Sequence, residues 1–204
     1  MKKKWHMECY RVIINTFFAL FMPLKVYNKE KLIKDGGGII AANHRSMLDM
    51  FMIGARIPRY LHWMAKKELF KNKLFAKIII GCGAFPVDRG NTDIGATKTA
   101  ISLLKSGELV GIFPEGTRNK DGKQKLKVHA GVAKFAIEAG VPVQPVAVWG
   151  GYRIFSRVYV RFGDPIYLPP NDSENPYTKA DYIRFANEIM DKCYSLMEDN
   201  GGNN

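Results

Sequence analysis

The sequence predicts a single α/β domain with a mixed, mostly parallel sheet flanked by helices. Short apolar runs typical of buried strands alternate with longer segments of helical spacing, as in β-α-β units. Polar turns follow several of the apolar runs, as they do where parallel strands end at one edge of a sheet. With 204 residues, 47% of them hydrophobic and 25% charged, the chain is long enough for one domain with a sizeable core.

The positions of the predicted elements follow from the spacing of apolar residues. Residues 36–42 begin with three glycines and continue as an apolar run, which predicts a buried strand. Further strands are expected at residues 61–65, 84–88, 109–114, 141–148 and 157–161. Helices are expected at residues 50–55, 66–80, 94–105, 131–139 and 178–197. Thr92 or Asp93 can cap the third of these helices, and Gly107 and Gly140 end the third and the fourth.

The first 25 residues are basic and then apolar. Lysines occupy positions 2–4, and the apolar run at 12–24 is shorter than the roughly 20 residues that a spanning helix needs. One hypothesis is a helix in the membrane interface, with Trp5 and Tyr10 at headgroup depth. A second is a helix packed on the core. A third is a signal peptide or spanning helix, although no small-residue cleavage site follows the run.

The charge of the chain points to anionic partners. Lysine and arginine number 31 against 19 acidic residues, which gives a net charge of +12. Such a surface suits nucleic acid, anionic lipid, phosphorylated substrates or an acidic protein. Cys9, Cys82 and Cys193 are scattered and form no CxxC or Cys/His cluster. Neither a disulfide framework nor a zinc site is therefore predicted, and a reducing compartment is favoured.

The candidate catalytic residues lie just after the strand at 36–42. His44 and Asp49 are separated by four residues, at the point where a strand passes to the next element. Histidine is the usual proton acceptor near neutral pH, and a carboxylate bonded to one ring nitrogen leaves the other nitrogen as the base. On this stretch alone, a capping histidine with a solvated aspartate is the alternative.

Later turns add cations and a glycine. Lys66, Arg89 and Arg118 suit the oxygens of a phosphate group, and Gly116 lets the backbone approach a ligand closely. The sequence has no GxSxG elbow, which makes Ser46 a poor nucleophile, and it has neither a P-loop nor an HExxH motif. Direct transfer to an acceptor hydroxyl activated by a base is the chemistry that remains.

Four segments, taken in order, resemble the motif blocks of the glycerolipid acyltransferases. The bacterial 1-acyl-sn-glycerol-3-phosphate (lysophosphatidate) acyltransferases are the most similar. The segments are Asn43-His44-(four residues)-Asp49, Ala84-Phe85-Pro86-Val87-Asp88-Arg89, Phe113-Pro114-Glu115-Gly116-Thr117-Arg118 and Val141-Pro142-Val143-Gln144-Pro145-Val146. Two departures are Pro86-Val87, where relatives usually carry two apolar residues, and His129, which is expected at the surface.

The resemblance implies a fold like that of the glycerol-3-phosphate acyltransferases and a direct acyl transfer. His44 is expected to take the proton from the free hydroxyl of lysophosphatidate, and Asp49 to orient His44. The oxygen then attacks the thioester of acyl-carrier protein or acyl-CoA, which gives phosphatidate for phospholipid synthesis. Substrate binding is assigned to Lys66, Arg89, Glu115, Gly116, Thr117 and Arg118, and within this set Glu115 is expected to organise the pocket. Neither a metal nor a cofactor beyond the acyl donor is expected.

The resemblance also implies a location and a division of the chain. Residues 1–25 are expected to form the membrane-interface helix, 26–199 the catalytic domain and 200–204 a flexible tail. The protein is expected to be monotopic on the cytoplasmic face of the cell membrane, with the anionic membrane surface as a partner. Nucleic acid is not expected, because no basic helix carries stacking aromatic residues. The alternatives are the same chemistry on glycerol 3-phosphate or another lysolipid, or a non-catalytic basic membrane-binding domain.

Overall fold

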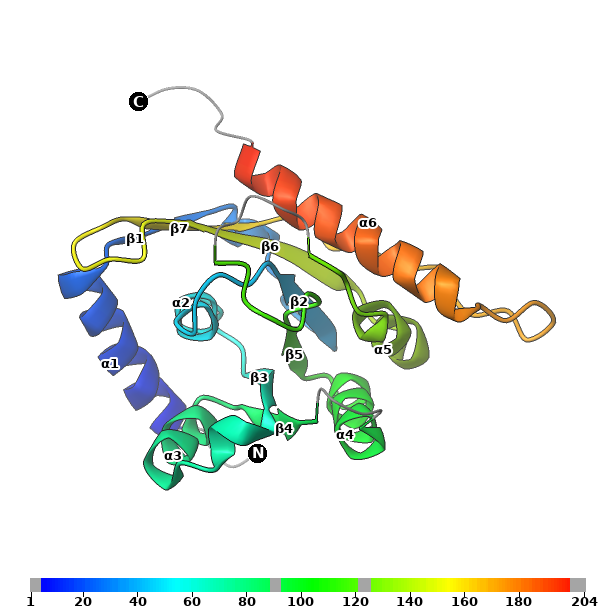
Figure 1. Cartoon of the computed structure of the whole chain (residues 1–204), viewed down its shortest axis with the longest axis horizontal. Helices are drawn as coiled ribbons and strands as arrows, with labels where there is room; N and C mark the ends of the chain where they lie inside the picture. The colour runs from blue at the N-terminus through cyan, green and yellow to red at the C-terminus, as the bar shows by residue number, and fades with distance from the viewer. Residues whose placement is uncertain (1–4, 89–92, 121–125, 199–204) are drawn as a thin grey trace.

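The computed structural model describes residues 5–88, 93–120 and 126–198, and its centre is a mostly parallel sheet (Figure 1). The seven described strands lie in the order β1-β7-β6-β2-β5-β3-β4. They are β1 (Leu24–Tyr27), β2 (Gly38–Ala42), β3 (Leu61–Lys66), β4 (Phe85–Val87), β5 (Leu109–Ile112), β6 (Val143–Gly150) and β7 (Val158–Phe162). Neighbouring strands are parallel except for the β6–β7 pair. The predicted fold class is confirmed.

Helices cover both faces of this sheet. They are α1 (Trp5–Phe21), α2 (Asp49–Gly54), α3 (Lys73–Gly81), α4 (Ile94–Lys105), α5 (Gly131–Ala139) and α6 (Lys179–Glu198). Figure 1 shows α1, α2 and α3 on one side of the sheet, and α4, α5 and α6 on the other. Successive residues of β2 serve the two faces, because side chains alternate along a strand. Ile40 and Ala42 pack with the first helix set, and Ile39 and Ala41 with the second.

The strand order brings the predicted polar turns together. β2 is parallel to β5, β5 to β3, and β3 to β4, so the carboxyl ends of all four strands lie at one edge of the sheet. The turns after β2 and β5 and the last residue of β3 therefore meet there. The expected convergence is confirmed for the turns after β2 and β5, whereas the third predicted turn, Asp88-Arg89, lies partly outside the described residues.

Two helices have the predicted bounds because their ends carry strong local signals. Asp93 caps α4, where its carboxylate accepts a hydrogen bond of 2.8 Å from the backbone N–H of Ala96. Gly140 ends α5 in the left-handed conformation, with φ of +65°.

The helix predicted for residues 66–80 is wrong in its first half. Lys66 is the last residue of β3, a short 3-10 helix spans Lys67–Phe70, and α3 begins only at Lys73. Asn72 interrupts the helical pattern, since its side chain caps α3 by accepting a hydrogen bond of 3.0 Å from the N–H of Phe75.

The N-terminal region differs from the predicted division at residue 25. α1 ends at Phe21, and β1 already pairs with β7 from Leu24, so the boundary falls inside a strand of the sheet. β1 escaped prediction because it is four residues long and only partly buried. Another short 3-10 helix follows at Lys29–Lys31. In the described part of the chain, no helix combines the length and the apolar character that crossing a bilayer requires.

Candidate active site

His44 and Asp49 form a hydrogen-bonded pair at the carboxyl edge of the sheet. His44 follows β2, and Asp49 is the first residue of α2. Nδ1 of His44 lies 2.9 Å from Oδ2 of Asp49. The Asp49 side chain is fully buried, whereas that of His44 is 12% exposed. The predicted contact is therefore present, and it leaves Nε2 as the ring nitrogen that can act as a base.

The backbone of the same loop fixes Asp49. Besides the ring of His44, Oδ2 accepts hydrogen bonds from the N–H groups of Arg45 at 2.7 Å and Ser46 at 2.8 Å. Three donors on one carboxylate oxygen hold the side chain in a single orientation. A five-residue separation is enough for the loop to close on itself in this way.

Asn43 anchors the beginning of this loop to the neighbouring strand. Its side chain is buried and makes two hydrogen bonds to the backbone of Val148 on β6. Nδ2 donates to the carbonyl oxygen and Oδ1 accepts from the N–H, each at 2.8 Å. Because Asn43 is tied to β6 in this way, the backbone that leads into His44 has a fixed position.

Glu115 holds the loop that carries His44 through a hydrogen bond to its backbone. Its carboxylate is buried, and Oε2 accepts a hydrogen bond of 2.9 Å from the N–H of His44. Oε1 accepts from the hydroxyl of Tyr194, which comes from α6. The N–H of Asn119 donates to the carbonyl oxygen of His44 at 2.6 Å, and its side chain donates to Tyr194 at 3.1 Å. Burial and the bond to Glu115 raise the pKa of Tyr194.

This placement agrees with the expected organising role of Glu115 and argues against direct contact of its side chain with the substrate. The side chain is 2% exposed and does not line the cavity at His44. Its carboxylate accepts hydrogen bonds from the N–H of His44 and the hydroxyl of Tyr194, so it organises the site. The residues that complete its network, Asn119 and Tyr194, carry no local sequence signal and were missed.

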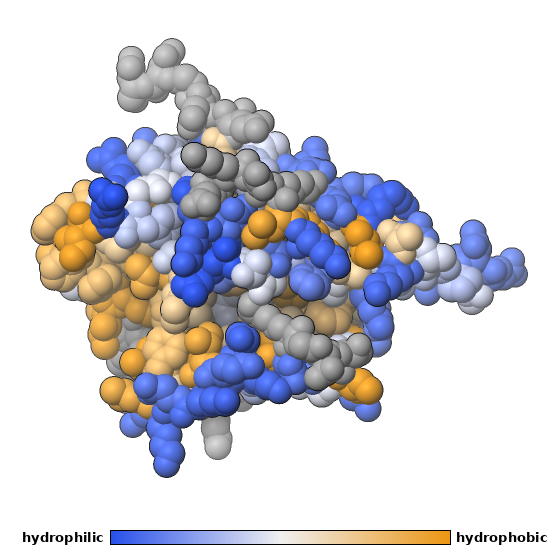
Figure 2. Space-filling view, in the orientation of Figure 1, coloured by the Kyte–Doolittle hydropathy of each residue, from blue (hydrophilic) through white to orange (hydrophobic). Residues whose placement is uncertain are grey.

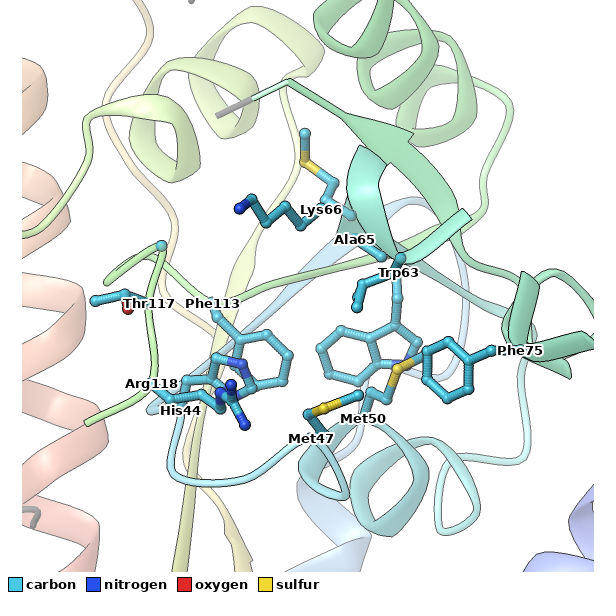
Figure 3. A pocket seen from close by; sticks show the side chains of 13 residues that line it. His44, Met47, Met50, Trp63, Ala65, Lys66, Phe75, Phe113, Thr117 and Arg118 are labelled. Carbon is cyan, nitrogen blue, oxygen red and sulfur yellow. The ribbon is translucent and has the colours of Figure 1, made fainter. Parts of the chain in front are cut away.

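A cavity of about 380 Å³ opens at His44 (Figure 3). Its polar lining is His44, Lys66, Gly116, Thr117 and Arg118, and its apolar lining is Met47, Met50, Trp63, Met64, Ala65, Leu69, Phe75 and Phe113. Figure 3 shows Thr117 and Arg118 beside His44, with Met47, Met50 and Phe75 toward the other end. The cavity therefore has a polar end, at His44, Thr117 and Arg118, and an apolar end.

Stacked aromatic rings form the floor of this cavity. The ring of His44 stacks on Phe113, with centroids 4.0 Å apart, and Phe113 stacks on Trp63 at 4.8 Å. Gly111 on β5 makes room for the stack, because a Cβ there would lie 2.4 Å from the Trp63 ring. These rings lie in apolar strands, and only the structure reveals that they support His44.

The predicted cations have different surroundings. Arg118 is exposed and lines the cavity. The side chain of Lys66 is about half exposed, and its amine lies 3.7 Å from a carboxylate oxygen of Glu68. Arg89 lies outside the described residues, so its predicted role stays a prediction. His129 is exposed, as expected, and lines a second cavity of about 410 Å³ on the far side of Phe113 and Gly116.

Gly116 cannot be replaced without disturbing this corner of the site. It has a φ of +63°, a conformation that favours glycine. A Cβ would also lie 2.9 Å from the ring of His129. The predicted need for glycine in this turn therefore has a steric basis.

Comparisons with known proteins agree with this geometry. A family model described as Acyltransferase matches residues 23–149, which include the four predicted motif blocks. A 1-acyl-sn-glycerol-3-phosphate acyltransferase of Bacillus subtilis (strain 168) is 39% identical over 160 residues, covering 76% of this chain and 79% of that protein. One from Streptococcus pneumoniae (strain ATCC BAA-255 / R6) is 37% identical over 148 residues, covering 69% and 54%.

A solved structure has the same fold. The crystal structure of the 1-acyl-sn-glycerophosphate (LPA) acyltransferase PlsC from Thermotoga maritima matches with a TM-score of 0.74 at 23% identity. The match covers all of this chain and 86% of that one. At this level of identity the likeness concerns the fold.

Proposed function

The chain belongs to the acyltransferase family, and we propose that it transfers a fatty acyl group to the free hydroxyl of 1-acyl-glycerol 3-phosphate, making phosphatidate. The observation that carries this proposal is the His44–Asp49 pair at a cavity with cations at one end and apolar residues at the other. Lysophosphatidate has a phosphate and an acyl chain on either side of its free hydroxyl. The names of the relatives support the same acceptor.

The proposed reaction uses His44 as a proton shuttle. Nε2 takes the proton of the acceptor hydroxyl, and the oxygen attacks the carbonyl carbon of the donor thioester. A C–O bond forms, the C–S bond breaks, and the imidazolium returns the proton to the leaving thiolate. Asp49 keeps Nδ1 protonated and stabilises the imidazolium. The donor is a thioester of acyl-carrier protein or CoA.

The acceptor phosphate is proposed to bind at the polar end of the cavity. Arg118 supplies a planar pair of donors, Lys66 a point charge, and Thr117 a hydroxyl. The backbone at Gly116 approaches the same space. The residues around Met47, Met50 and Phe75 provide an apolar lining for an acyl chain.

Arg118→Ala is expected to raise KM for lysophosphatidate about ten- to a hundredfold, because a hydrogen bond to a charged group contributes about 1.5–3 kcal/mol. The free energy of unfolding should stay unchanged, since Arg118 is exposed. Steady-state kinetics over a range of acceptor concentrations measure the effect. Lys120→Ala is the matched control, because Lys120 has the same charge, is exposed and does not line the cavity. An equal effect in both variants would assign the role of Arg118 to bulk charge.

We also propose that the protein lies on the cytoplasmic face of the membrane without crossing it. α1 places Phe18 in the core and exposes apolar residues on its other side. The exposed residues are Val12, Ile13, Phe17, Leu20 and Phe21. Figure 2 shows an apolar area over α1 at the left of the view. The net charge of +12 favours an anionic surface.

The loop between β6 and β7 extends this apolar area. The N–H of Phe155 donates to the carbonyl oxygen of Phe21 at 2.6 Å, which joins the loop to the end of α1. Ile154 and Phe155 are 67% and 76% exposed. Two segments far apart in sequence therefore offer apolar side chains to the same lipid surface.

Ile13→Asp is expected to weaken binding to anionic phospholipid vesicles about tenfold or more, since burying a side chain of this size is worth about 1.5–3 kcal/mol. Co-sedimentation with the vesicles measures it. Tyr167→Asp is the control, because Tyr167 is 77% exposed and follows β7 rather than lying on α1. If both variants sediment like the unaltered protein, α1 is not the lipid contact.

Thiol release tests the proposed function. The protein is assayed in lipid or detergent with acyl-carrier-protein and acyl-CoA donors, and with lysophosphatidate, glycerol 3-phosphate or no acceptor. Release that requires lysophosphatidate is the expected result. Release with glycerol 3-phosphate alone would keep the mechanism and change the acceptor. A folded protein that releases no thiol with any pair would overturn the proposal.

A further inference from the structure

The Asp49 carboxylate uses only one of its two oxygens. Oδ2 accepts three hydrogen bonds, but Oδ1 is buried and has no hydrogen-bond partner among the described residues. An unpaired carboxylate oxygen in the interior is costly, and native structures rarely leave one without a reason. A polar side chain close to Asp49 is therefore a candidate partner for Oδ1.

Tyr152, in the loop between β6 and β7, lies near Asp49. Its hydroxyl oxygen is also buried and, in the described structure, also without a hydrogen-bond partner. Burial raises the pKa of Tyr152, and the nearby Asp49 carboxylate raises this pKa further. The hydroxyl and the carboxylate therefore belong to neighbouring side chains, and each has a buried oxygen without another partner among the described residues. On its other side, the ring of Tyr152 lies 5.6 Å from the guanidinium carbon of Arg45.

The loop holds Tyr152 independently of Asp49. The N–H of Gly151 donates to the carbonyl oxygen of Arg157 at 3.0 Å, and that of Arg153 donates to the hydroxyl oxygen of Ser156 at 2.8 Å. Gly150 has a φ of +117°, and a Cβ there would lie 2.4 Å from the carbonyl oxygen of Arg157. These contacts within residues 150–157 therefore hold the Tyr152 side chain in place near Asp49.

We propose that Tyr152 is a positioning residue of the catalytic pair, whose hydroxyl donates a hydrogen bond to Oδ1 of Asp49 whether His44 is neutral or protonated. The hydroxyl adds a contact on Oδ1 to the three contacts on Oδ2 that already orient the carboxylate toward Nδ1 of His44. Tyr152 does not line the cavity, so it acts through Asp49 and not on the substrate. This inference rests on the proposed acyl transfer at His44 and adds a residue that the sequence motifs do not contain.

Tyr152→Phe tests the proposal while keeping the ring against Arg45. We expect kcat to fall about tenfold, as for loss of a hydrogen bond to a charged group, with KM for lysophosphatidate unchanged. The acidic limb of the pH profile of kcat/KM should move to higher pH. The charged and titratable groups against Asp49 are His44, Arg45 and Tyr152. Without the hydroxyl, the carboxylate holds the proton on His44 more strongly.

A measurement without substrate separates this proposal from the proposed function. NMR follows the ring signals of His44, assigned with His44→Ala, through a pH titration of the full chain. The midpoint should rise in Tyr152→Phe and stay unchanged in Tyr159→Phe, whose ring stacks on Trp149 on β6. An unchanged midpoint in folded Tyr152→Phe would overturn the proposal, whether or not the protein transfers acyl groups. If the midpoint of the His44 titration rises in Tyr152→Phe but the protein is inactive on every acceptor, the contact between Tyr152 and Asp49 is supported and the proposed function is contradicted.

Discussion

His44→Ala is expected to lower kcat for lysophosphatidate-dependent thiol release by about 10²–10⁴-fold, which is the usual contribution of a general base. The imidazole is the group at the cavity whose free nitrogen can take the hydroxyl proton, and Asp49 is buried behind it. Alanine cannot replace it, and water in the vacated space would be a far weaker base. The loop should keep its shape, because its anchors at Asn43 and Glu115 use side chains or backbone that the substitution leaves in place.

The control for this prediction is His62→Ala. His62 lies on β3, its ring lies 3.9 Å from Glu108, and it does not line the cavity. It should keep near-wild-type turnover. Retention of most of the activity in folded His44→Ala would exclude the general-base mechanism and favour a binding role for the domain.

Glu115→Ala is expected to lower the free energy of unfolding by about 3 kcal/mol, because it leaves buried donors without an acceptor. The N–H of His44 and the hydroxyl of Tyr194 both lose their partner. Turnover should also fall, since the loop that carries His44 loses its support. Urea unfolding followed by circular dichroism gives the stability, and thiol release gives the activity.

Glu138→Ala is the matched control for Glu115→Ala. Glu138 is an exposed residue of α5, so its replacement should change stability by no more than about 0.5 kcal/mol. If Glu115→Ala were as stable as this control but bound lysophosphatidate poorly, the original assignment of Glu115 to substrate binding would be restored. The two variants thus separate support of the loop from contact with the acceptor.

The parts of the protein that sequence predicts well are those whose signals are local. The bounds of α4 and α5 follow from a capping carboxylate at Asp93 and a left-handed glycine at Gly140. His44 and Asp49 lie in one short loop, so their contact needs only a turn of the backbone. Convergence of the turns follows from the parallel sheet, which strand–helix alternation already indicates.

The supports of the site depend on contacts that no local pattern encodes. Tyr194 and Tyr152 reach the catalytic loop from α6 and from the turn after β6, and their own surroundings in the sequence are ordinary. Glu115 belongs to a motif that suggests a ligand, yet its burial is decided by the packing of Tyr194 and Asn119. α1 combines a core side, at Phe18, with an exposed apolar side, so the hypothesis of a helix packed on the core accounts for only part of its surface.

The bond between Glu115 and Tyr194 affects the order of events during synthesis of the chain. The ribosome must translate past Tyr194 before the carboxylate of Glu115 gains its hydroxyl partner. Likewise, β1 cannot pair with its parallel neighbour until β7, which begins at Val158, has been synthesised. A nascent chain that ends at α5 therefore contains His44 and Asp49 but neither of these late contacts. The support of the catalytic loop is therefore complete only after α6 has been synthesised.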